Sequence, residues 1–436
     1  MARMILADGT MMTTLQRILT LLAILISGTA GIAEDEPAPD QSVADEVAVP
    51  PLVKLWEAQA VLNVGRDKVA HIVNDEDIVF VQSTAGIVTA LNAESGREMW
   101  TAQVGRTDEV AMPATSNASI VMIVAGPTLY ALNKFSGKEL FSYRLPNQPS
   151  AGPVITESSF FVPLSDGSIV ACSLKTLQYL ERYHKLPPGI GHAVAWHFST
   201  GEVIKFAPVA GSSRVGFVTD QGNIHVLDIS GVQAGRSKFQ FLMQSPATAP
   251  LTLVTRDQEY ILTAAANHRL FCIGMNTSGR MEWQFPLGHQ ISEPITVIGQ
   301  DVYIVGDEGE LMGLGLKSGL PLQTTDEQQF ALADVKVLVS VTEKAVYVID
   351  SAARLVTANR KTGKIMTKEH FPDLTVPIRN SVTDRVYLSS TSGRVVCMKE
   401  SGIDFPIYHQ NPQRSPIMPE VANPAPAAVE GSKENN

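Results

Sequence analysis

A strand-and-turn unit recurs eight times along this chain, at successive spacings of 40 to 55 residues. The clearest copy, residues 77–104, reads DIVFVQSTAGIVTALNAESGREMWTAQV, with short apolar runs separated by turns that contain glycine or asparagine. Runs of this kind are typical of β-strands joined by tight turns. The residues aligned as equivalents are Ala90, Ala131, Ala171, Val226, Phe271, Gly313, Thr357 and Cys397. A period of roughly 40–50 residues predicts propeller blades.

Eight blades need a closure, and the two ends of the repeat region supply one. Residues 54–59 (KLWEAQ) resemble residues 98–103 (EMWTAQ), which form the expected outer strand of the first blade, whereas the last copy lacks a clear outer strand after Cys397. We therefore expect the strand of Trp56 to complete blade eight, because a closed ring removes exposed sheet edges. The sequence predicts an all-β, eight-bladed propeller of four-stranded antiparallel blades over residues 51–405; an open stack of β-units is the alternative.

The segments outside the repeats have a different composition. Residues 1–33 are predicted to be a signal peptide, because Arg3 and Arg17 precede an apolar run at residues 18–26 and small residues follow at Gly31 and Ala33. We expect cleavage after Ala33; cleavage after Ala30 and retention as an anchor are the alternatives. Residues 34–50 are rich in acidic residues, Ala and Pro, and residues 406–436 in Pro, Ala and then polar residues. We expect both to be disordered, as a linker and a tail.

Charge and cysteine content narrow the classes of function. The net charge of −10 and the lack of a Lys/Arg cluster argue against nucleic acid as a partner. Cys172, Cys272 and Cys397 fall in blades three, five and eight, too far apart for a disulfide. We expect three free, buried thiols.

The longest spacing contains an insertion around residues 182–206. It holds His192, His197 and Trp196, which does not align with the repeat position of Trp56, Trp100 and Trp283. Loops on a rigid scaffold often carry function, so Trp196, His192 and His197 are candidate partner-binding residues. The alternative is a longer blade connection with Trp196 packed on the adjacent blade, and a metal site from the two histidines is a weaker hypothesis.

Catalytic motifs do not stand out elsewhere. Asp166-Gly167 and Glu308-Gly309 occupy the turn position of the repeat, where we interpret them as turn residues. There is no G-x-S-x-G, phosphate-loop or H-E-x-x-H motif. We expect no catalytic, cofactor-binding or metal-binding residue.

The segments ALNAESGREMW and ALNKFSGKELF resemble the pyrroloquinoline-quinone (PQQ) repeat. Eight such repeats in an exported chain of this size are similar to the BamB-type subunit of the outer-membrane β-barrel assembly machine. That resemblance implies a non-enzymatic, periplasmic or secreted scaffold, monomeric and without a membrane span after signal cleavage, whose partners are envelope or outer-membrane proteins. The chain departs from BamB-type lipoproteins because no Cys lies near the cleavage junction for lipid attachment.

The same repeat also implies an alternative function. Quinoprotein dehydrogenases resemble this chain in blade count, and in that family PQQ lies in the central channel between a Trp and a pair of adjacent cysteines, beside a calcium ion. This sequence has no adjacent Cys pair. A PQQ-dependent dehydrogenase, or a small-ligand sensor that uses the channel, is therefore the second hypothesis.

Overall fold

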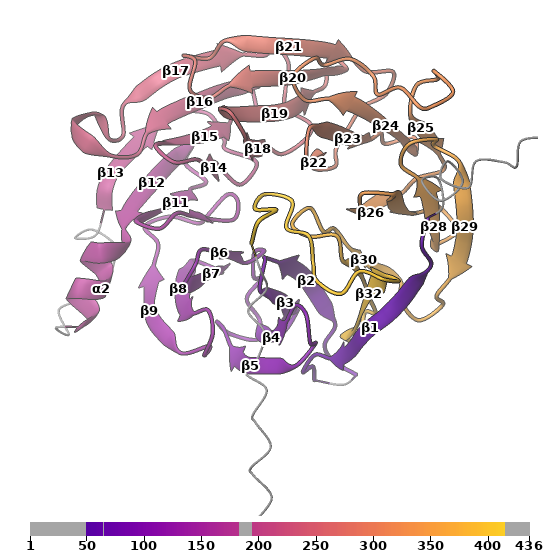
Figure 1. Cartoon of the computed structure of the whole chain (residues 1–436). Helices are drawn as coiled ribbons and strands as arrows, with labels where there is room; N and C mark the ends of the chain where they lie inside the picture. Colours follow the sequence, from indigo (N-terminus) through magenta and orange to yellow (C-terminus); the bar gives the residue numbers. More distant parts are fainter. Residues whose placement is uncertain (1–48, 64, 183–193, 415–436) are drawn as a thin grey trace, which may run out of the picture. The chain divides into compact units, whose positions relative to one another are not determined.

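The computed structural model describes residues 49–63, 65–182 and 194–414. Its strands form eight antiparallel sheets of four strands each, which follow one another around a ring (Figure 1). The all-β, eight-bladed propeller predicted from the repeat is confirmed.

Each blade runs from an inner strand at the channel to an outer strand at the rim. Blades one to four comprise β2 (Val69–Asn74), β3 (Ile78–Ser83), β4 (Ile87–Asn92) and β5 (Glu98–Gln103); β6 (Thr115–Ser116), β7 (Ile120–Ala125), β8 (Thr128–Asn133) and β9 (Glu139–Arg144); β10 (Val154–Ile155), β11 (Ser159–Pro163), β12 (Ser168–Ser173) and β13 (Val194–Ser199); and β14 (Val209–Ala210), β15 (Arg214–Val218), β16 (Asn223–Asp228) and β17 (Ser237–Leu242). Blades five to eight comprise β18 (Thr252–Thr255), β19 (Glu259–Ala265), β20 (Arg269–Gly274) and β21 (Met281–Pro286); β22 (Thr296–Ile298), β23 (Asp301–Val305), β24 (Glu310–Gly315) and β25 (Ala331–Ala333); β26 (Val337–Val341), β27 (Ala345–Ile349), β28 (Arg354–Asn359) and β29 (Ile365–His370); and β30 (Val376–Ile378), β31 (Val386–Ser389), β32 (Arg394–Glu400) and β1 (Leu52–Gln59). A helix, α2 (Leu174–Arg182), follows β12, and a 3-10 turn, η2 (Gly231–Gln233), follows β16.

The two middle strands of each blade form the core. Strands β3 and β7 are buried along their whole length, because both faces of a blade pack against neighbouring blades. Continuous apolar sequences such as IVMIVA in β7 follow from this two-sided burial. Outer strands such as β5 bury fewer residues, among them Trp100.

Aromatic residues of the outer strands lock adjacent blades together. The indole of Trp56 lies over Gly96 of blade one, and that of Trp100 lies over Gly137 of blade two. The glycine has a positive φ, and a Cβ atom on Gly96 would lie 2.5 Å from Cδ2 of Trp56. Each indole also donates a hydrogen bond to the neighbouring blade, at 2.9 Å from Trp56 Nε1 to the carbonyl of Ala93. Glycine is thus required at this turn both for its backbone conformation and for the room it leaves.

The two ends of the propeller meet in blade eight. Strand β1 pairs antiparallel with β32, with Trp56 opposite Cys397, as the indigo and yellow strands show in Figure 1. Arg394 of β32 also contacts Glu57 of β1, with 2.7 Å between Nε and Oε1. The predicted closure by the strand of Trp56 is confirmed.

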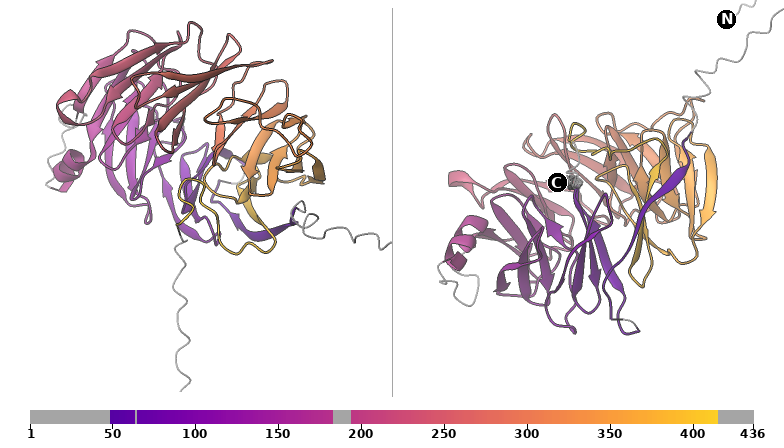
Figure 2. Two further views of the ribbon diagram at one scale, coloured as in Figure 1. Left: turned by 45° about the horizontal axis from the view of Figure 1, so that its top comes forward. Right: turned by 60° about the horizontal axis from the view of Figure 1, so that its bottom comes forward.

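The ordered structure extends past the predicted C-terminal boundary at residue 405. Tyr408 is 2% exposed and forms an antiparallel bridge with Thr383 of blade eight. Residues 406–409 therefore contact the propeller, and the prediction of a disordered tail beginning at residue 406 was wrong for these four residues. Figure 1 shows this yellow end of the chain inside the ring of blades, and Figure 2 shows the same segment from two further directions. The remaining tail, the predicted signal peptide and residues 34–48 of the predicted linker lie outside the described residues.

Within the described ranges, no helix combines the length and the apolar character that a transmembrane span requires. The three cysteines are free and buried in blades three, five and eight, as predicted.

Candidate functional site

Trp196 occupies the repeat position on β13. It lies opposite Ala171, just as Trp100 lies opposite Ala90. Its indole covers Gly235 of blade four and lies 5.6 Å from the ring of Phe161, between centroids. The prediction that Trp196 stands outside the repeat position was therefore wrong; it is a half-buried packing residue between blades three and four.

A helix explains the longer spacing that concealed this equivalence. In blade three, α2 replaces the short turn between the third and fourth strands, and its residues Leu174 and Leu177 are buried against blades two and three. The spacing of Leu174, Leu177 and Leu180 was the sequence signal that could have revealed the helix. His197 is exposed on β13, and His192 lies outside the described residues. Among the described residues, no group of three His, Cys, Asp or Glu side chains has a metal-binding arrangement.

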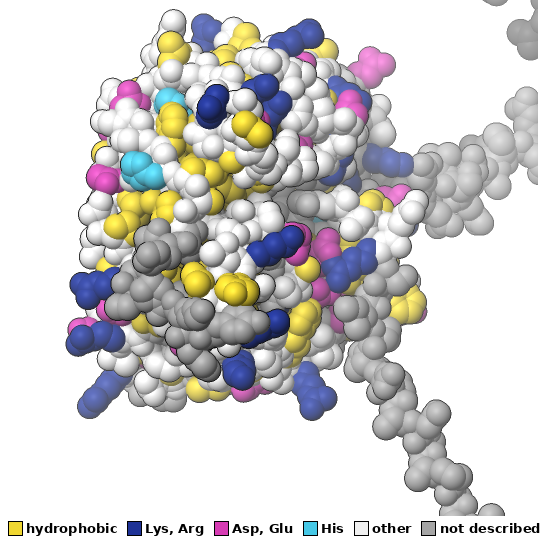
Figure 3. Space-filling model, turned by 90° about the vertical axis from the view of Figure 1, so that its left-hand side faces the viewer, with side chains coloured by type: hydrophobic (Ala, Val, Ile, Leu, Met, Phe, Trp, Pro, Cys, Tyr) yellow, Lys and Arg dark blue, Asp and Glu magenta, His cyan; other side chains and the backbone are white. Residues whose placement is uncertain are grey.

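The side of the propeller around α2 carries apolar surface. Figure 3 shows hydrophobic side chains gathered there between polar areas. Tyr179 of α2 is 57% exposed and Leu242 of β17 is 56% exposed. The binding role predicted for Trp196, His192 and His197 at this edge stays a prediction.

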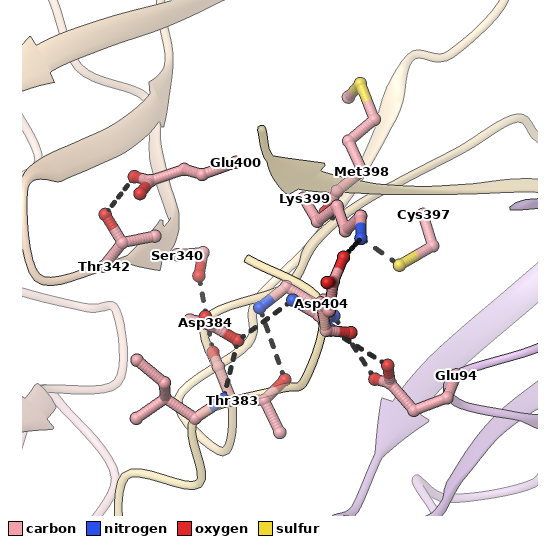
Figure 4. Close-up of polar contacts among 12 residues, drawn as sticks. Glu94, Ser340, Thr342, Thr383, Asp384, Cys397, Met398, Lys399, Glu400 and Asp404 are labelled. Atoms are coloured by element: carbon pink, nitrogen blue, oxygen red, sulfur yellow. Dashed lines mark hydrogen bonds and ion pairs between the residues drawn. The ribbon is translucent and has the colours of Figure 1, made fainter. Parts of the chain in front are cut away.

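A buried arginine marks the junction where blade eight meets blade one. The Arg385 side chain is fully buried and forms a two-pronged contact with Glu94, with 3.3 Å from Nε to Oε1 and 3.0 Å from Nη2 to Oε2. Glu94 belongs to the third turn of blade one, whereas Asp384, 3.5 Å from Nη1 of Arg385, belongs to blade eight. Figure 4 shows Glu94, Asp384 and Asp404 converging from these separate segments. The paired geometry suits a guanidinium, whose fork matches a carboxylate.

Burial shifts the pKa values of the charged groups at this junction. Burial raises the pKa of Asp384, although Arg385 opposes the shift. For Arg385, burial lowers the pKa, but the hydrogen bonds and charge of Glu94 outweigh it, so the pKa lies above its usual value. Tyr387 donates a hydrogen bond of 3.3 Å to the carbonyl of Ala93, the same acceptor that Trp56 uses. Blade one is thus held to blade eight by polar contacts in addition to the β1–β32 pairing.

Residues 404–414, which we call the C-terminal strap, continue this junction toward the channel. The backbone N–H of Asp384 donates to the carbonyl of Ile407, and that of His409 donates to the carbonyl of Val382. Nε2 of His409 is buried without a hydrogen-bond partner among the described residues. Burial lowers the pKa of His409 to about 4, with a further contribution from the charges of Arg360 and Arg256.

The strap ends at an acidic hollow of about 690 Å³ between blades one, two and eight. We define this hollow by Asp75, Glu76, Asp77, Lys134, Phe135 and Arg414. Lys134 is nearly buried, with its Nζ 2.9 Å from Asp75 and 3.5 Å from Asp77. The guanidinium of Arg414 contacts Asp77, at 2.6 Å from Nη2 to Oδ1, and also contacts Glu76. Phe135 is 44% exposed at the edge.

Sequence reasoning missed this hollow. The run Asp75-Glu76-Asp77 is contiguous and was visible as a charged turn, but turns are usually charged. Its cations come from another blade and from the strap, 57 residues away for Lys134 and 337 for Arg414. Only the closed ring brings these groups together.

The family of this chain is revealed by comparison with known sequences. The profile of the family described as outer membrane protein assembly factor BamB matches residues 84–231 and 193–403. The chain belongs to this BamB family. Its match spans most of the propeller, from the turn that follows β3 in blade one to residue 403, just after β32. No curated protein matches the chain significantly.

Solved structures show the same fold at low sequence identity. The crystal structure of BamB from Moraxella catarrhalis is 17% identical, with a TM-score of 0.58, over 81% of this chain and 99% of that one. The computationally designed protein Ika8 is 13% identical, with a TM-score of 0.57, over 79% of this chain and 98% of that one. Sqt1 from Saccharomyces cerevisiae is 10% identical, with a TM-score of 0.56, over 78% of this chain and 97% of that one. At these identities the three likenesses support the propeller fold alone.

Because the chain resembles the PQQ repeat, its residues can be compared with those that a PQQ site requires. The three cysteines of this BamB-family chain are non-adjacent and lie buried in the third strands of three blades. Burial raises the pKa of the Cys172 and Cys272 thiols to about 12, as expected of thiols packed among apolar side chains. The residues described here therefore do not fit the pair of adjacent cysteines that the resemblance implies for a quinone site.

Proposed function

We propose that this BamB-family propeller is an exported, non-enzymatic scaffold that binds proteins of the cell envelope, and that it acts in outer-membrane protein assembly. The observation that carries the proposal is the family match over residues 84–403, on a chain whose repeat frame is complete. A propeller presents its turns on two rigid faces, which suits the docking of extended segments from a partner.

The geometry favours the face that carries the first and third turns of each blade. This face holds the acidic hollow and the strap, which join residues from blades one, two and eight. Polar groups and an exposed aromatic side chain, Phe135, lie side by side there. Such a mixture is common at the edges of protein interfaces, where aromatic anchors adjoin polar contacts.

Depletion of the protein in its native host tests the proposal. We expect lower levels of folded outer-membrane β-barrel proteins, measured by heat-modifiable migration on gels, with restoration by the wild-type gene. Affinity capture of the mature protein from envelope extracts should recover the same partners in replicate experiments. Unchanged β-barrel protein levels together with no reproducible partner would refute the scaffold.

A thermal-shift titration separates the scaffold from the quinoprotein hypothesis. If the channel binds PQQ, adding PQQ with Ca²⁺ should raise the melting temperature in a saturable way. We expect no saturable shift, because the cysteine arrangement does not fit the quinone site.

A further inference from the structure

We propose that the acidic hollow is a recognition site for an arginine-bearing extended segment of a partner protein, and that Arg414 of the C-terminal strap occupies it in the free chain. The inference rests on the proposed scaffold function and deepens it, because it names the surface and the chemistry of the partner.

The hollow already holds a guanidinium. Arg414 contacts two carboxylates at once, Glu76 and Asp77. Its guanidinium also lies over the ring of Tyr408, 5.1 Å from the centroid. Carboxylates on one side and an aromatic face on the other are the two surfaces that arginine binds best. The arrangement around Arg414 therefore matches a guanidinium.

The carboxylates that line the hollow outnumber its cations. Asp75, Glu76 and Asp77 face two cations, Lys134 and Arg414. Lys134 neutralises Asp75 and reaches Asp77, so departure of Arg414 leaves Glu76 without the cation it contacts here. Burial raises the pKa of Asp77, and the charge of Lys134 opposes that shift. An empty hollow would thus attract another positive group.

The end of the strap makes few backbone hydrogen bonds to the rest of the propeller. Tyr408 anchors the strap, being almost fully buried and bridged to Thr383. After His409 the backbone hydrogen bonds are local, from Asn411 to Tyr408 and from Arg414 to Asn411. Residues 410–413 are exposed. The side chain of Arg414 can leave the hollow while Tyr408 stays in place.

A tethered arginine competes with a partner in a defined way. A short tether gives the bound group an effective concentration on the order of millimolar. A partner segment must exceed this competition, so removing Arg414 should strengthen its binding. Phe135 at the edge offers a contact for an apolar residue beside the arginine of that segment.

The test measures binding of a fluorescein-labelled peptide, Gly-Ser-Phe-Arg-Ser-Gly, by fluorescence anisotropy. The proteins are the wild-type chain, Arg414→Gln, and the control Arg106→Gln, which removes an exposed arginine paired with Asp108 elsewhere. A chain that ends at residue 413 is a second way of removing Arg414. We expect Arg414→Gln and the shortened chain to bind at least fivefold more tightly than wild type and Arg106→Gln.

Two further comparisons identify the site. A peptide with citrulline in place of arginine keeps the shape but not the charge, and should show no gain. Adding Glu76→Gln to Arg414→Gln should abolish the gain. Equal affinity of wild type and Arg414→Gln for the arginine peptide, including no binding to either, or an equal gain with the citrulline peptide, would overturn the proposal. Envelope capture with the wild-type protein would still test the scaffold function independently.

Discussion

Replacement of Gly96 by alanine should weaken the closure of the ring. Gly96 has φ of +67°, and an added Cβ atom would lie 2.5 Å from both Cδ2 and Cε3 of Trp56. The left-handed backbone costs an alanine about 1–2 kcal/mol. Displacing the indole adds about 1–3 kcal/mol, as overpacking of a core does. We therefore expect Gly96→Ala to lower the free energy of unfolding by about 2–5 kcal/mol.

Gly201 supplies a matched control. It has a similar φ of +73°, but an added Cβ atom there meets nothing within 4 Å. Gly201→Ala should therefore show only the backbone cost of about 1–2 kcal/mol. Gly137→Ala places the same overlap on Trp100, at 2.6 Å, within the continuous chain, and should match Gly96→Ala.

Urea denaturation followed by tryptophan fluorescence measures these differences, because Trp56 and Trp100 lie at the affected junctions. Equal midpoints for Gly96→Ala and Gly201→Ala would refute the reasoning, since the contact with Trp56 would then contribute nothing. A larger loss for Gly96→Ala than for Gly137→Ala would show that the closing junction is the weaker of the two.

Three other predictions follow from the junction and the core. Glu94→Ala should lower the free energy of unfolding, measured by urea denaturation, by about 3–5 kcal/mol, because it leaves the buried Arg385 without its main partner. The control Glu98→Ala, on the exposed edge of β5, should change it by about 0.5 kcal/mol or less. Similar losses for the two variants would contradict the role of the ion pair. Because the pKa of His409 falls from 6.5 to about 4 on folding, the unfolded chain binds the proton more readily. The contribution of neutral His409 to the free energy of unfolding is complete above pH 6.5, and roughly 3 kcal/mol of it is lost as the pH falls toward 4. His409→Asn should therefore reduce the pH dependence of the free energy of unfolding in this range, measured by urea denaturation. A thiol reagent at pH 8 should leave the buried Cys172, Cys272 and Cys397 unmodified in the folded chain. After denaturation without reductant, the same reagent should react with three thiols per chain. Fewer than three reactive thiols would indicate a disulfide.

Local sequence patterns predicted the fold because the strands and turns of most blades lie within about 40 consecutive residues. Turn glycines and outer-strand tryptophans recur at short spacings, so the closure by Trp56 could be predicted from its likeness to Trp100. Alignment by spacing failed where the local structure changed. In blade five, Phe271 was aligned with Ala90, but Cys272 is the residue opposite Trp283. A shift of one residue turns every side chain to the other face of the sheet.

The candidate site could not be predicted because its parts are distant in the sequence. Glu94 and Arg385 are 291 residues apart. Neither residue has a local signal that distinguishes it from an ordinary surface charge, and Arg385 also donates a hydrogen bond to the carbonyl of Asp404, at the start of the strap. Pairing of charges across blades depends on closure of the ring, which short-range patterns do not encode.

Placing the outer strand of blade eight at the start of the propeller has a consequence for biosynthesis. Glu57 and Arg394, which meet across the β1–β32 pair, are 337 positions apart. Strand β1 is synthesised before every other strand of the propeller, whereas its partner β32 is synthesised after all of them. The sheet of blade eight can therefore be completed only after the other seven blades have been synthesised, and its closing contact has a much larger sequence separation than the contacts within the other blades, which favours slow formation. Until then, β1 lacks the strand of the propeller with which it pairs.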